Sequence, residues 1–206
     1  MKHMLLGASA LTLIWGVAIA QPADQPGHKS PRAGTNSETM SAAEDTTAGV
    51  VGKVSAEMTS TTKGFVQAAA TSDMYEVAAG KIAVERARSA DVKAFAQQMI
   101  QAHTATTATL KGILASNKIN VAPPAHVDDR RQGMLDNLRG ASAADFDHRY
   151  ITQQVAAHEE ADILFRGYAK DGDNAAVRNF ASKTDGDIRH HLSMAKDLDK
   201  STMARK

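Results

Sequence analysis

The chain has no cysteine, few aromatic residues and almost no net charge. The absence of cysteine excludes disulfides, thiolate metal sites, cysteine nucleophiles and the lipid-bearing cysteine of a bacterial lipoprotein. The 24 lysines and arginines balance 23 aspartates and glutamates, so there is no electrostatic basis for binding nucleic acid or anionic lipid. Nothing resembles a nucleophile paired with a base or a glycine-rich phosphate loop.

Long apolar runs are also lacking, except at the N-terminus. There, Leu5–Ala20 is uncharged and mostly apolar, follows Lys2, and ends in Ala-Ile-Ala, which places small residues where signal peptidase cuts. The run is shorter than the roughly 20 residues that a membrane span needs. We therefore predict a signal peptide over 1–20, no transmembrane anchor in the mature chain, and export to the periplasm or cell envelope of a bacterium.

The next segment has too few large apolar residues to bury a core. Residues 21–61 contain three of the five prolines among serine, threonine, glycine, alanine and aspartate. Such a composition does not offset the entropy lost on ordering, which predicts a disordered leader over 21–61. We predict a folded domain over 62–199 and a disordered tail over 200–206.

Within 62–199, apolar residues recur at alternating spacings of three and four, the period of an amphipathic helix. No stretch shows a convincing strand pattern. The pattern predicts an all-α fold, an antiparallel four-helix bundle with a short extra helix in the long central connection. The expected long helices cover about 62–88, 90–117, 142–170 and 175 onward, and the short one covers about 127–139.

Each long helix carries one ionisable residue within its apolar stripe: Glu76, His103, His158 and His191. Such groups are costly to bury without partners. Counted along straight helices from the turns that join them, Glu76 and His103 are level to about 1.5 Å, whereas His158 and His191 differ by about 7 Å. The four side chains are thus expected to meet inside the bundle.

Two interpretations of this polar group stay open. One carboxylate and three imidazoles would suit one divalent transition metal, such as zinc, iron, nickel or copper, or a small ligand. Nearby Asp73, Asp162 and Asp187 would then accept hydrogen bonds from the ligands. Alternatively, Glu76 bonds the histidines in a structural polar layer that fixes the packing register. Met99 and Met194 also raise the idea of copper(I), although methionine commonly fills cores.

Several segments resemble the bacterial domain of unknown function 4142 family, which is often described as a predicted outer-membrane protein and grouped with ferritin-like bundles. The segments are Phe65-Val66, Met74-Tyr75-Glu76-Val77, Val92-Lys93-Ala94-Phe95-Ala96-Gln97-Gln98-Met99 with His103, Phe146-Asp147 with Tyr150 and His158, and His191-Leu192 with Ala195. The resemblance covers about residues 62–199 and implies a ferritin-like fold and an exported location. It also implies that Glu76, His103, His158 and His191 are recurrent polar positions, but it brings no established activity.

The chain departs from that pattern at Ala102, where family members commonly have an acidic residue. It also departs from di-iron ferritins, which use Glu-x-x-His pairs, because Ile100, Val155 and Ile188 stand three residues before the histidines. Iron storage is therefore not expected. The sequence favours non-enzymatic binding of a metal or small ligand. The alternatives are an envelope-stress or protein-interaction module and a mononuclear metal oxidoreductase.

Overall fold

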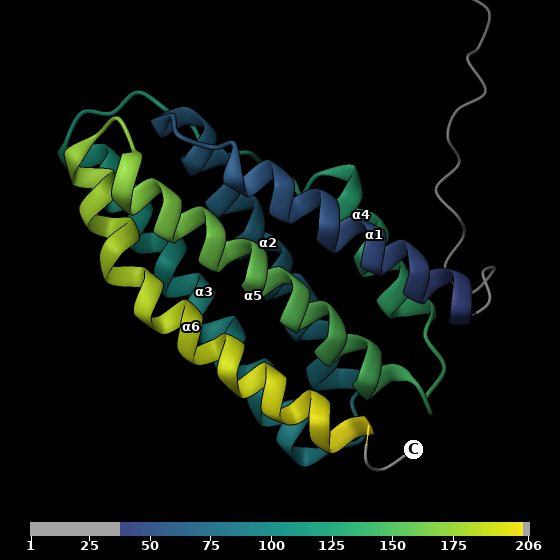
Figure 1. Ribbon diagram of the computed structural model, residues 1–206. Helices are drawn as coiled ribbons and strands as arrows, with labels where there is room; N and C mark the ends of the chain where they lie inside the picture. Colours follow the sequence, from purple (N-terminus) through teal and green to yellow (C-terminus); the bar gives the residue numbers. More distant parts are fainter. Residues whose placement is uncertain (1–37, 204–206) are drawn as a thin grey trace, which may run out of the picture.

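The structure is a computed structural model that describes residues 38–203, and its regular secondary structure is entirely helical (Figure 1). This confirms the predicted all-α class. The six helices are α1 (Glu38–Glu57), α2 (Thr62–Arg86), α3 (Ala90–Ser116), α4 (Asp129–Gly140), α5 (Phe146–Asp171) and α6 (Ala175–Met203).

The four long helices that follow α1 form two hairpins that pack against each other. Residues 87–89 join α2 to α3, and residues 172–174 join α5 to α6. In addition to these hairpin contacts, α2 packs on α5 and α3 packs on α6, so each long helix contacts two others (Figure 1). The short helix α4 lies in the connection between the hairpins, as predicted. This arrangement surrounds a shared interior with α2, α3, α5 and α6.

Local side-chain chemistry sets several of the helix ends. Thr61 and Asp128 each accept a hydrogen bond from a backbone N–H in the first turn of the following helix, at 3.1 and 2.7 Å. Asn174 does the same for α6, at 3.0 and 3.2 Å. At the turn before α3, Asp147 from α5 accepts the backbone N–H groups of Arg88 and Ser89, which ties the two hairpins together.

The predicted disordered leader over 21–61 is wrong for residues 38–57, which form α1. A search for apolar periodicity misses this helix because its buried side is made of small and polar residues at helical spacing. Those residues are Ser41, Asp45, Gly49, Gly52 and Ala56. The tail predicted over 200–206 is likewise wrong at its start, because α6 continues to Met203. The predicted signal peptide and the segment 21–37 lie outside the described residues.

Polar contacts and close backbone approach hold α1 against α5. The buried Asp45 pairs with Arg149 at 3.0 Å and accepts a hydrogen bond from Gln153 at 2.8 Å. A Cβ atom on Gly49 would lie 3.1 Å from the Cβ of Ala156, so the missing side chain allows the two helices to approach. The ordering of α1 therefore depends on α5 and is not encoded in α1 alone.

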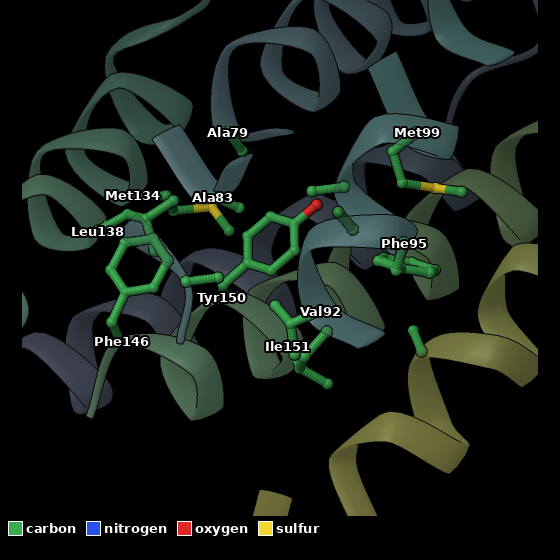
Figure 2. Close-up of a cluster of buried hydrophobic side chains, with 14 of the residues drawn as sticks. Ala79, Ala83, Val92, Phe95, Met99, Met134, Leu138, Phe146, Tyr150 and Ile151 are labelled. Atoms are coloured by element: carbon green, nitrogen blue, oxygen red, sulfur yellow. The ribbon is translucent and has the colours of Figure 1, made fainter. Parts of the chain in front are cut away.

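The buried apolar side chains form two clusters, one toward each end of the long helices. The first includes Phe95, Met99 and Tyr150, with the Tyr150 ring at its centre and its hydroxyl directed away from Phe146 (Figure 2). The second cluster contains Phe65 and the aromatic side chains that contact it, which are Phe165, Tyr168 and Phe180.

The three candidate histidines lie at the boundary between these clusters. On α3, His103 falls between Met99 of the first cluster and Leu110 of the second. His158 on α5 and His191 on α6 have the same intermediate placement. A polar layer therefore interrupts the apolar core at one level. None of the helices within residues 38–203 is both long and apolar enough to cross a membrane.

Candidate metal site

The structure brings His103, His158 and His191 together in the interior. Their ring centroids are 5.6 Å apart for His103 and His158, 5.9 Å for His103 and His191, and 5.6 Å for His158 and His191. All three residues are at most 7% exposed. One nitrogen from each ring lies within 4.8 Å of a nitrogen of the other two.

A carboxylate orients the His103 ring. Its Nδ1 lies 2.8 Å from Oδ1 of Asp73, and the other oxygen of Asp73 accepts a hydrogen bond from Thr107 at 2.8 Å. This leaves the buried Nε2 of His103 without a hydrogen-bond partner among the described residues. A carboxylate behind a histidine is the usual support of a metal ligand, because it fixes the ring and increases the basicity of the opposite nitrogen.

The other two imidazoles also have a free buried nitrogen. Nδ1 of His158 donates to the backbone carbonyl of Gln154 at 2.9 Å, which makes Nε2 the nitrogen with the lone pair. That Nε2 and Nδ1 of His191 have no hydrogen-bond partner within residues 38–203. Three buried ring nitrogens left without partners would be costly if nothing occupied the space between them.

The protonation of the site favours ligation by two of the three rings. Burial lowers the pKa of His158 to about 3, and the nearby His103 contributes to the shift. Burial likewise lowers the pKa of His191 to about 4, with further contributions from His158 and His103. Burial also disfavours charge on His103, but the Asp73 hydrogen bond and the charges of Glu76 and Asp73 outweigh it and raise its pKa. His158 and His191 are therefore neutral at pH 7, as a metal ligand requires.

The spacing of the nitrogens is close to what a metal ion needs. A triangle with 4.8 Å sides places its centre about 2.8 Å from each corner, and zinc–imidazole bonds are about 2.1 Å long. Each nitrogen therefore needs to move inward by no more than about 0.7 Å, which small rotations of the rings supply. Three imidazoles without a thiolate suit zinc, iron, nickel or copper.

Glu76 lies beside the three histidines but is not part of the group whose ligand atoms all lie within 4.8 Å of one another. Its Oε1 is 3.9 Å from Nδ1 of His158, the nitrogen that already bonds Gln154. Both carboxylate oxygens are buried without a hydrogen-bond partner in the described part of the chain. Burial raises the pKa of Glu76, although the charge of His103, the amide of Gln154 and the charge of Arg131 oppose the rise.

The supporting carboxylates predicted from sequence differ in their placement. Asp73, expected one turn from Glu76, supports His103 on the neighbouring helix. Asp187 is exposed on α6, and its charge acts on His191 to oppose the lowering of that pKa. Asp162 instead pairs with Arg166 at 3.0 Å. Of these three carboxylates, Asp73 alone has a defined hydrogen bond to one of the candidate histidines within the described residues.

Sequence reasoning did not single out Gln154 or the buried hydroxyl of Tyr150 near this site. The amide of Gln154 is buried and acts on Glu76, and the buried hydroxyl of Tyr150 has no hydrogen-bond partner within the described residues. The spacing of Gln154 four residues before His158 was the available signal. Of the methionines considered for copper(I), Met99 belongs to the first apolar cluster, and the partly buried Met194 packs against that cluster and accepts a hydrogen bond from Gln98 at 3.8 Å.

A cavity of about 260 Å³ lies against the candidate site. All four long helices line it, and its walls include His103 and His191 together with Asp73, Thr106, Phe165 and Asp187. The cavity therefore borders two of the three histidines.

Comparison with known proteins places the chain in a family without an assigned activity. Residues 51–198 match the model of the domain of unknown function (DUF4142), and the chain belongs to that family. The match begins inside α1, so this helix is partly within the region that family members share. Neither a curated protein nor a solved structure matches the chain.

Proposed function

We propose that this protein binds one divalent transition-metal ion through His103, His158 and His191, in a ferritin-like antiparallel four-helix bundle made of α2, α3, α5 and α6. The proposed activity is binding and not catalysis. We further propose that the protein is exported to the periplasm or cell envelope of a bacterium, on the strength of its N-terminal sequence.

The observation that carries the proposal is the convergence of three buried imidazoles, each of which has a buried nitrogen without a hydrogen-bond partner among the described residues. In a purely structural polar layer, buried acceptors are expected to face donors. Here the donors face outward: the His158 ring donates to Gln154, and the His103 ring is held from behind by Asp73. A cation between the three rings would satisfy all of them at once. Zinc is the first metal to test, because three histidines with one open position form a known zinc arrangement.

Elemental analysis tests the proposal directly. Untagged protein, loaded with zinc, iron or copper and then freed of unbound metal, is expected to retain one equivalent of at least one of these ions per chain. His103→Ala and His158→Ala should remove that equivalent. His190→Ala is the matched control, because this exposed histidine adjoins His191 on α6. Failure of every metal to bind, or equal binding by all variants, would refute the proposal.

An interaction module is the second candidate, and one observation favours it. The outer side of α1 exposes Val50, Val51 and Val54, and Met58 directly follows the helix; each is at least half exposed. Contiguous exposed apolar residues commonly mark interaction surfaces. Val54→Lys would impair such a function without changing metal content, whereas His158→Ala would have the opposite effect.

A further inference from the structure

The candidate metal site is open on one side. His103 and His191 line the cavity of about 260 Å³, whereas His158 is not part of its lining. All four long helices contribute to the walls, and exposed residues such as Thr109 and Asp187 are among them, so the cavity opens to solvent. A metal ion held by the three rings would therefore border this space directly.

The described part of the chain supplies no fourth ligand of the usual kind on that side. Within residues 38–203, no further histidine or carboxylate joins the group of three. Asp73, the nearest acidic side chain on the cavity wall, uses its two oxygens for His103 and Thr107. Three protein ligands leave at least one coordination position of a divalent transition metal to water or to another molecule.

The size and chemistry of the cavity restrict what can take that position. A water molecule occupies about 30 Å³ of liquid, so the cavity has room for a larger molecule. Phe165, Phe180 and Ile188 form an apolar wall, while threonine hydroxyls provide polar groups. Apart from the histidines, the ionisable side chains in its described lining are the carboxylates of Asp73 and Asp187, whose two negative charges would balance those of a bound divalent ion, so an anionic ligand would add uncompensated charge.

We propose that the metal ion bound by His103, His158 and His191 keeps a coordination position open to this cavity and accepts there a small uncharged molecule through a nitrogen or oxygen donor. This inference rests on the proposed metal binding and specifies the ligand class of the same site. The juxtaposition of free ring nitrogens with a cavity lined by carboxylates and apolar groups supports it.

Cobalt(II) in place of the native metal makes the open position visible. The electronic absorption of the untagged, cobalt-loaded full chain reports its coordination, and imidazole is the uncharged probe with azide as the anionic comparison. We expect imidazole to change the spectrum with saturation at one equivalent per cobalt, and azide to bind more weakly. A spectrum that neither probe changes, or one that only azide changes, would overturn the inference while leaving metal binding intact.

A matched pair of threonines locates the probe. Thr106 lines the cavity and Thr104 is exposed on the same helix, and each hydroxyl donates to the carbonyl four residues earlier. Thr106→Leu should fill the cavity and weaken imidazole binding by about tenfold or more, with cobalt affinity unchanged, while Thr104→Leu should behave as wild type.

Equal imidazole affinity in the two variants would contradict the proposed position. If Thr106→Leu does not fold, Thr184→Leu, which fills the same cavity from α6, tests the proposed position of imidazole in its place. Absence of cobalt binding by the wild-type chain would instead refute the proposed function itself, so the two failures are distinguishable.

Discussion

The buried imidazole of His158 should make the metal-free protein less stable in mild acid. Its pKa is lowered by burial from an ordinary 6.5 to about 3, so the folded protein keeps this ring neutral while the unfolded chain protonates it. The unfolded state thus binds more protons below pH 6.5, and stability falls as the pH drops from there toward 3. At pH 5, the loss from this single group is about 1.36 × 1.5, or about 2 kcal/mol. That is a large fraction of the usual stability of a domain.

Other ionisable groups at the site contribute with different signs. The pKa of His103 is raised, so its stabilising contribution is present below pH 6.5 and is lost as pH rises through the folded value. The raised pKa values of Asp73 and Glu76 favour the folded state at low pH, which opposes the effect of His158. A comparison of variants separates these contributions, whereas the wild-type profile alone does not.

Urea denaturation of wild type and His158→Gln, with a chelator present, measures the effect. Between pH 7 and pH 5, the wild type should lose about 2 kcal/mol more than the variant, whatever the starting stability of each. His190→Gln is the control and should retain the wild-type profile, since its exposed side chain meets solvent in both states. Parallel profiles for wild type and His158→Gln would refute a buried, neutral His158.

Three further substitutions, two of them with a matched control, test the supporting structure. Asp73→Asn should weaken metal affinity by about 10- to 100-fold in a competition titration, because the ligand loses its orienting carboxylate; unchanged affinity would argue against that role. Glu160→Gln should destabilise the fold by about 3 kcal/mol in urea denaturation, because Glu160 pairs with the buried Arg131 as well as with the partly buried Arg130. Glu159→Gln is the control: the half-buried Glu159 pairs with two lysines, and its loss should lower the free energy of unfolding by less than about 1 kcal/mol. Equal losses for Glu160→Gln and Glu159→Gln would contradict the argument. Gly52→Ala should lower the free energy of unfolding by about 1–3 kcal/mol in the same assay, because the added Cβ would meet the Glu160 carboxylate. Gly186→Ala is the control and should not destabilise the protein, because the space around Gly186 is open. Equal effects of the two substitutions would contradict the close packing of α1 against α5.

The long helices were predictable because burial there follows apolar residues. The stripe around Phe65 in α2 and the stripe around Val177 in α6 have the period of a helix and are buried as expected. Helix α1 was not predictable in this way, because tertiary contacts such as Asp45 with Arg149 stabilise it. Periodic small residues such as Gly49 and Gly52 were the signal that apolar patterning ignores.

The convergence of the histidines was predictable, but the details of their support were not. Counting from Gly172 predicted an offset of about 7 Å between His158 and His191, yet their side chains bring the ring centroids to 5.6 Å. The pairing of Asp73 with His103 depends on how α2 and α3 are rotated against each other. A sequence pattern shows which face of a helix a residue is on. It does not fix the rotation of one helix against its neighbour precisely enough to say which two side chains meet.

The geometry of the zinc-loaded protein is the most direct test of the central claim. A crystal structure of that form should show one ion bonded to ring nitrogens of His103, His158 and His191 at about 2.0–2.1 Å, with the three rings drawn together. An ion bound instead at surface histidines or carboxylates, with the three buried rings unmoved, would contradict the account.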